Sequence, residues 1–162
     1  PNVQLVLCTN GTMMTPKIQK KYDHIMRRAE SYRFSIDAGN KETYEKVRKG
    51  GQWEMLWDNI NYCYETYIQH MDTTWNNRWC FNLILQDDNY ESLLELVRIA
   101  NSYEKKPEIY VTNMLHWSNS IMSNDKFDDM AVWQQTHPRH EDMKKTLNHP
   151  EIRNYENISV PF

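Results

Sequence analysis

The stretch WCFNLILQDDNYESLLELVRIANSYEKKPEIYVTN, residues 79–113, decides the fold class. It opens with a β-rich run at residues 79–86 and closes with a second one at residues 107–113. Between these runs, apolar residues recur at the spacing of one helix face, namely Leu93, Leu96, Val97, Ala100 and Tyr103. A strand, a helix and a strand in this order predict two parallel strands joined by a right-handed crossover.

The same alternation extends toward the N-terminus, where further β-rich runs are separated by helical patterns. We therefore predict one α/β domain with parallel strands at residues 3–9, 33–37, 79–86 and 107–113. Residues 1–113 would hold these strands and their helices. Residues 114–162, which contain Pro138, Pro150 and Pro161, are expected to form an irregular or helical C-terminal extension of the same domain.

Polar residues mark where the helices should begin. Thr15 before Pro16 is typical of an N-cap followed by the first helical residue, and Asn40 is expected to cap a second, short helix. Asp88 with Glu91 resembles a capping pair. The first helix is expected to bury one apolar face, formed by Ile18, Tyr22, Ile25, Met26 and Ala29.

Composition excludes several classes of protein. The chain of 162 residues is 40% apolar and 25% charged, which rules out a disordered or collagen-like chain, and no apolar run approaches the length of a membrane span. Cys8, Cys63 and Cys80 lack the spacing of a structural zinc site, and their odd number argues against a disulfide framework. We therefore expect a reducing, cytoplasmic location. The net charge of −3 gives no general reason to expect nucleic acid as a partner.

Polar side chains gather at the expected C-terminal ends of the strands. They are Asn10, Asp37, Gln86 and Asn113. In parallel α/β sheets this edge carries the functional site, because the loops after the strands converge there. Alternation places Ser35 and Asp37 on one face, opposite Phe34 and Ile36, which suits a polar interior that holds a ligand. The alternative is that such residues only begin loops.

Residues 35–51, SIDAGNKETYEKVRKGG, together with Thr9-Asn10-Gly11, resemble the radical S-adenosylmethionine superfamily. The resemblance is to its iron–sulfur oxidoreductase branch, which often carries a C-terminal auxiliary-cluster domain. The matching features are the TNG and SID strand ends, Tyr44 with Arg48, and the glycine pair at 50–51. The Gln-x-x-Asn at residues 86–89 is also similar. The resemblance covers residues 3–113 well and the tail more loosely.

This resemblance implies a partial (β/α)6 barrel, of which the chain would hold strands three to six. The family cofactors are S-adenosylmethionine and a [4Fe–4S] cluster on a CxxxCxxC motif. That motif is absent from these 162 residues, and the three cysteines are too far apart to replace it. The resemblance thus implies the distal part of an oxidoreductase whose missing N-terminal segment holds the cluster. In this family the reduced cluster cleaves the sulfonium, and the resulting 5′-deoxyadenosyl radical abstracts hydrogen from a substrate.

The resemblance also implies roles for single residues. Ser35 and Arg48 would bind the carboxylate of S-adenosylmethionine, and Asp37 would form hydrogen bonds inside the cofactor pocket. The remaining pocket residues would be Thr9, Asn10 and Gln86, with Asn113 and Trp117 facing the substrate. Each has a structural alternative: a solvated helix cation for Arg48, a turn cap for Asp37, and turn or loop hydrogen bonds for the others.

Two other functions remain open from the sequence. A non-catalytic interaction or structural module could keep this fold and dock on a partner chain that covers an open sheet edge. A doubly wound nucleotide-binding domain is a weaker alternative, because the chain lacks the usual glycine fingerprint.

Two clusters of ionisable residues also permit more than one interpretation. One is basic, with Lys17, Lys20, Lys21, Arg27 and Arg28, and suits a solvated helix face or a phosphate or nucleic-acid patch. The other combines His137, His140 and His149 with Glu141, a permissible metal ligand set at a spacing that is not typical of zinc.

Overall fold

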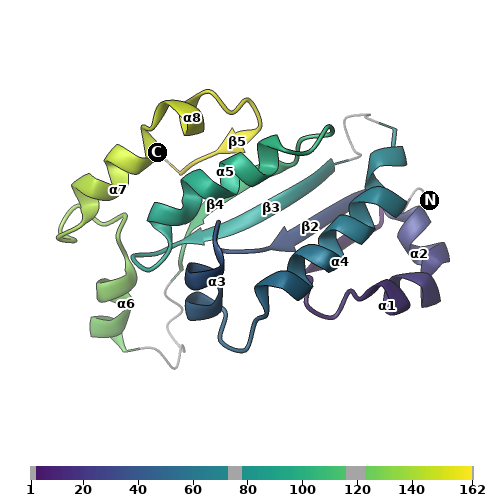
Figure 1. Cartoon of the computed structure of the whole chain (residues 1–162). Coiled ribbons are helices and arrows are strands. Elements are labelled where there is room, and N and C mark those ends of the chain that lie inside the picture. The colour runs from purple at the N-terminus through teal and green to yellow at the C-terminus, as the bar shows by residue number, and fades with distance from the viewer. Residues whose placement is uncertain (1–2, 73–77, 116–122, 162) are drawn as a thin grey trace.

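The computed structural model describes residues 3–72, 78–115 and 123–161. They form a five-stranded sheet in the order β1-β2-β3-β4-β5, and every pair of neighbouring strands is parallel (Figure 1). The strands are β1 (Val6–Thr9), β2 (Ser31–Ser35), β3 (Arg78–Leu85), β4 (Glu108–Asn113) and β5 (Ile158–Ser159). The four predicted strands are confirmed with small shifts of their bounds, and β5 is an addition.

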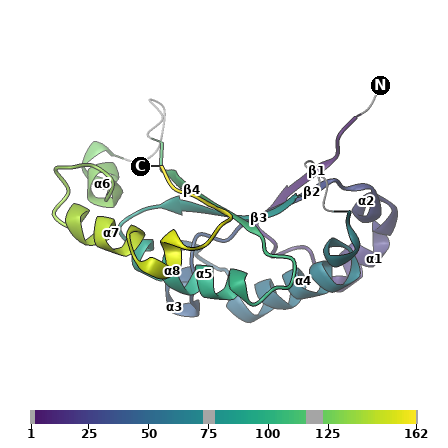
Figure 2. The same ribbon diagram turned by 90° about the horizontal axis from the view of Figure 1, so that it is seen from above.

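Helices cover one face of this sheet. They are α1 (Pro16–Lys21), α2 (Asp23–Arg28), α3 (Lys41–Val47), α4 (Trp53–Thr66), α5 (Leu93–Asn101), α6 (Asn124–Met130), α7 (His140–Leu147) and α8 (Pro150–Arg153), with short 3₁₀ turns η1 (Ile68–His70) and η2 (Tyr90–Ser92). Figure 2 shows the sheet curved away from the helices, with α6 and α7 near the end at which β3 and β4 terminate. The strand order of the described residues does not reverse, which contradicts a doubly wound arrangement.

The core lies between the helices and the covered face of the sheet. Tyr32 and Phe34 of β2 and Phe81 of β3 are almost completely buried there, because apolar residues alternate along both strands. The aromatic side chains of α4 belong to this core: Trp57 packs edge-on against Phe81, with ring centroids 5.6 Å apart.

The starts of α1 and α3 follow the predicted caps. The Thr15 side chain accepts a hydrogen bond from the Ile18 N–H group at the start of α1. The Asn40 side chain accepts one from the Thr43 N–H group at the start of α3. Each side chain thus satisfies one of the backbone donors that a helix N-terminus leaves free.

The predicted capping pair of Asp88 and Glu91 is wrong. The chain first forms η2, and no side chain caps the start of α5. Asp88 instead forms an ion pair with Lys46, and Glu91 forms one with Arg139. Both carboxylates therefore form ion pairs with residues that are far away in sequence.

The first predicted helix is interrupted at Tyr22. The backbone of this residue (φ −110°, ψ 29°) ends α1 and precedes α2. Ile18 and Tyr22, expected in the core, are 38% and 41% exposed, whereas Met26 and Ala29 are buried. The change of direction at Tyr22 turns the α1 part of the apolar stripe toward solvent.

The C-terminal extension has more regular structure than the sequence indicates. Residues 123–161 form α6, α7, α8 and β5, which pairs with β4 through Ile109 and Ile158. In the described ranges, no helix has both the length and the apolar character required to cross a membrane.

The second face of the sheet carries a polar row. Register places Ser35 beside Asn82, Asn82 beside Tyr110, and Tyr110 beside Ser159. No helix of the described residues covers the middle of this concave face (Figure 2). Its neighbouring side chains Arg33 and Ile84 are exposed to solvent.

Candidate functional site

Asp37 joins the C-terminal ends of β2 and β3. Among the described residues it is the one non-glycine residue with a positive φ, 60°. Its Oδ1 atom accepts a hydrogen bond of 2.7 Å from the Ile84 N–H group, and its Oδ2 atom forms an ion pair with Nη2 of Arg48. Asp37 therefore does not continue the alternation from Ser35, because the strand ends at Ser35 and the backbone then turns into the left-handed region.

Asn89 is the second link between these strand ends, and no role was assigned to it beyond its place in the Gln-x-x-Asn motif. Its buried side-chain amide donates to the carbonyl oxygens of Asp37 and Ile84, both at 2.9 Å. Its Oδ1 atom accepts from the Gln86 N–H group at 2.9 Å. Gln86 is half-buried, and the hydrogen bonds that the structure gives it are made by its backbone. This agrees with the loop alternative for Gln86.

Arg48 lies beside a cavity of about 480 Å³. Asn10, Tyr44, Gly50 and Gly51 also line this cavity. One nitrogen of the guanidinium is held by Asp37, while Nε is buried and has no partner among the described residues. A guanidinium fixed on one side and unsatisfied on another is suited to bind a carboxylate or phosphate.

Thr9 and Asn10 shape the turn after β1. The Thr9 hydroxyl accepts from the Gly11 N–H group at 3.0 Å. The Asn10 Oδ1 atom accepts from the N–H and hydroxyl groups of Thr12 at 3.2 and 2.8 Å. Thr9 and Asn10 therefore both stabilise the turn, which is the structural alternative that the sequence analysis stated for them. Asn10 additionally lines the Arg48 cavity, whereas Thr9 pairs in register with Phe34 on the helix-covered side of the sheet.

The remaining predicted residues are not gathered around Arg48. Ser35 ends β2 on the open face and does not line the Arg48 cavity. Asn113 pairs in register with Leu85, which places it on the helix-covered side, and its Oδ1 atom is buried with no partner in the described ranges. Trp117 lies outside the described residues. The structure thus brings Asn10, Asp37 and Arg48 together, and leaves Ser35 and Asn113 on opposite faces.

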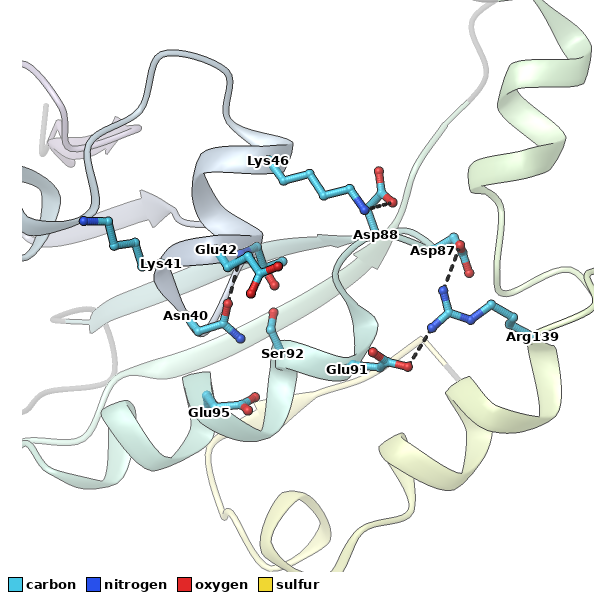
Figure 3. Close-up of a pocket in the computed structure, with 11 residues that line it drawn as sticks. Asn40, Lys41, Glu42, Lys46, Asp87, Asp88, Glu91, Ser92, Glu95 and Arg139 are labelled. Carbon is cyan, nitrogen blue, oxygen red and sulfur yellow. Dashed lines mark hydrogen bonds and ion pairs between the residues drawn. The ribbon is translucent and has the colours of Figure 1, made fainter.

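A second cavity of about 570 Å³ lies at the same edge of the sheet, between the start of α3 and the η2–α5 segment (Figure 3). Ion pairs border it: Lys46 with Asp88 at 2.8 Å, and Arg139 with Asp87 at 3.1 Å and with Glu91 at 2.6 Å. The lining holds five carboxylates and three cations, so the ion pairs leave it with an excess of negative charge.

The histidines of the C-terminal segment contact the backbone. Each has a ring nitrogen in hydrogen bond with a backbone group: His137 with the Arg139 N–H group, His140 with the Val132 carbonyl, and His149 with the Glu151 N–H group. Within residues 3–72, 78–115 and 123–161, no group of three or more His, Cys, Asp or Glu side chains could hold a metal ion. These contacts favour a structural role for the three histidines.

The cysteines do not fit an iron–sulfur cluster. Cys8 is exposed on β1, Cys63 is buried on α4 and Cys80 is buried on β3. Burial raises the pKa of the Cys63 and Cys80 thiols to about 12, which disfavours the thiolate form that ligates iron. No chemistry of such a cluster can be assigned to residues of this chain.

The cysteines should differ sharply in reactivity. In the native protein at about pH 8, iodoacetamide should alkylate Cys8, while Cys63 and Cys80 stay unmodified because they are buried and protonated. Peptide mass spectrometry after brief labelling measures this directly, and labelling in urea serves as the control in which all three react. Equal native labelling of Cys63 and Cys8 would contradict the described packing of α4.

The chain was compared with family models, with curated proteins and with solved structures, and none of them matches it.

Proposed function

We propose that this chain forms the distal wall of a radical S-adenosylmethionine type of barrel. It would contribute surfaces for the cofactor and the substrate, while residues outside these 162 would hold the iron–sulfur cluster. The observation that carries the proposal is the sequential parallel sheet, with helices on one face and a curved polar face left uncovered. A segment of a (β/α) barrel has this organisation, since each strand is followed by a helix on the outside.

Arg48 is the residue most suited to hold the cofactor in this proposal. Its unpartnered, buried Nε atom could donate to the carboxylate of S-adenosylmethionine, while Asp37 keeps the guanidinium in place. Ser35 does not line this cavity, and in this proposal it would contact only a part of the cofactor that extends onto the concave face. S-adenosylmethionine would supply a sulfonium centre when bound, and the residues of this chain would orient it.

Replacing Arg48 should remove only the contribution that the carboxylate of S-adenosylmethionine makes to binding. Isothermal titration calorimetry of the purified chain should show that Arg48→Ala lowers the affinity for S-adenosylmethionine by about 10- to 100-fold, the range for a lost charge-assisted hydrogen bond. Decarboxylated S-adenosylmethionine should bind the original chain weakly, and Arg48→Ala should not weaken it further.

Arg28, which is exposed on α2 and does not line this cavity, provides the matched control, and Arg28→Ala should leave the affinity unchanged. Because Arg48→Ala leaves the Asp37 carboxylate without its cation, Arg48→Lys should be tested beside it, and circular dichroism should verify folding. An equal loss for both ligands in a folded variant would exclude a contact with the carboxylate.

The uncovered face favours one second candidate, a non-catalytic module that docks on a partner chain. Val3 and Val6, at the β1 edge, are 64% and 38% exposed, and β1 has no second neighbour among the described strands. The same titration separates the candidates. Saturation with S-adenosylmethionine supports the cofactor wall, and a folded chain that releases no heat at millimolar ligand supports the module.

A further inference from the structure

The basic charge of this chain is concentrated on α1 and α2. Residues 17–28 contain five Lys and Arg side chains and one Asp, a net charge of +4 in a chain of −3, so the other residues carry −7. All five basic side chains are exposed: Lys17, Lys20, Lys21, Arg27 and Arg28. We call these five residues the basic patch. The overall negative charge therefore conceals a positive surface.

Most of this charge is not neutralised within the protein. Arg27 pairs with Asp23 at 2.9 Å, but the other four members have no ion-pair partner in the described ranges. Some cations elsewhere in the fold are paired, since Lys41, Lys46 and Arg98 each form an ion pair, but no other segment of the described residues has unpaired cations at this density. An exposed cluster of unpaired cations creates a positive potential that attracts polyanions.

Aromatic rings lie among these cations. The Lys21 ammonium is 5.3 Å from the ring centre of Tyr22, and the Lys20 ammonium is 5.7 Å from that of Tyr62. Tyr22 is 41% exposed, because the interruption between α1 and α2 turns it away from the core. Cations beside an accessible aromatic ring are the combination with which proteins bind single-stranded nucleic acids, by phosphate contacts and base stacking.

A membrane surface fits this region less well. An interfacial helix needs a continuous free apolar face to enter the lipid, but α2 buries Met26 in the core, and the following Ala29 is buried as well. On this part of the surface, α1 and the residue after it leave only two large apolar side chains exposed, Ile18 and Tyr22, at 38% and 41%, over less than two helical turns. The basic patch also lies at the end of the molecule opposite α6 and α7 (Figures 1 and 2). A ligand there would not compete with the contacts among Asp87, Glu91 and Arg139.

From these observations we infer that the basic patch, with Tyr22, binds single-stranded nucleic acid. The phosphates would contact the lysine and arginine side chains, and one base would stack on Tyr22. Recognition of this kind depends on charge and stacking and is largely independent of base sequence.

The test is fluorescence anisotropy of a labelled oligothymidine titrated with the purified chain. Binding should weaken steeply between about 50 and about 200 mM salt, because phosphate contacts release counterions. The triple variant K17E/K20E/K21E should lose at least about tenfold in affinity, and the slope of log affinity against log salt should fall by about two for three lost contacts. Tyr22→Ala should weaken binding and leave that slope unchanged.

The control variant K106E/K126E/K144E changes the net charge equally at exposed positions outside the patch, and it should bind as the original chain does. Circular dichroism verifies that both triple variants fold. Three outcomes would overturn the inference: no binding at about 50 mM salt, equal loss in both triple variants, or binding confined to phosphatidylglycerol vesicles or to polyglutamate. The last outcome would assign the patch to a membrane or to an acidic protein.

Discussion

Gly39→Ala should destabilise the protein by about 3 kcal/mol or more. A Cβ atom at this position would lie 1.9 Å from the Ser92 carbonyl oxygen and 2.3 Å from the Leu96 nitrogen. Both are backbone atoms, one at the end of η2 and one in the first turn of α5, so the loop after β2 would have to move away from them. The Gly39 N–H group would then lose its 3.1 Å hydrogen bond to the Ser92 hydroxyl.

Gly50 provides the matched control for this substitution. Its φ of +82° makes alanine unfavourable, but no atom lies within 4 Å of the added Cβ. Gly50→Ala should therefore lower the free energy of unfolding by only about 1–2 kcal/mol, the cost of placing a residue with a Cβ atom in the left-handed conformation. Urea unfolding followed by circular dichroism measures both variants. A smaller loss for Gly39→Ala than for Gly50→Ala would show that the β2–α3 loop does not pack on η2 as described.

Asn89→Ala should also lower the free energy of unfolding by about 3 kcal/mol, because it leaves one buried and two partly buried backbone groups without these hydrogen bonds. The carbonyl oxygens of Asp37 and Ile84 would lose their donor, and the Gln86 N–H group would lose its acceptor. Each buried polar group left unpaired costs about 1–3 kcal/mol. Asn89→Ala should also lower the affinity for S-adenosylmethionine, because Asp37 would no longer hold the Arg48 guanidinium as firmly in the proposed site.

Asn101 is exposed near the end of α5 and serves as the control. Asn101→Ala should change the free energy of unfolding by no more than about 0.5 kcal/mol, as is usual for surface substitutions. Urea unfolding of both variants, together with their affinity for S-adenosylmethionine, gives the comparison. If Asn89→Ala were as mild as Asn101→Ala, the amide could not be the link between β2 and β3.

The strands could be predicted because their signal is local. Apolar residues alternate along β2 and β3, and turn residues follow each strand, so the order and direction of four strands could be inferred from the sequence. β5 could not, because its two residues form a strand only where the backbone meets β4. α7 was missed for a similar reason, since it buries only Met143 and Leu147 and is otherwise polar.

The candidate site was predicted in part. The sequence singled out Asp37, Arg48 and Asn10, and the structure brings Asp37 into contact with Arg48 and places Asn10 at the same cavity. The left-handed backbone of Asp37 could not be foreseen, because it depends on the Ile84 N–H group of another strand. Asn89 was visible as part of a Gln-x-x-Asn motif, yet its three hydrogen bonds arise only once β2 and β3 are adjacent.

The most direct test of the proposed cofactor wall observes the Arg48 guanidinium itself. In ¹H–¹⁵N correlation spectra of arginine side chains, the signal missing from Arg48→Lys identifies the Nε–H group of Arg48. We expect this signal to shift downfield when S-adenosylmethionine is added, because a carboxylate becomes its acceptor, and we expect the decarboxylated analogue to leave it in place. An unchanged signal at saturating S-adenosylmethionine, or the same shift with both ligands, would contradict a carboxylate site at Arg48.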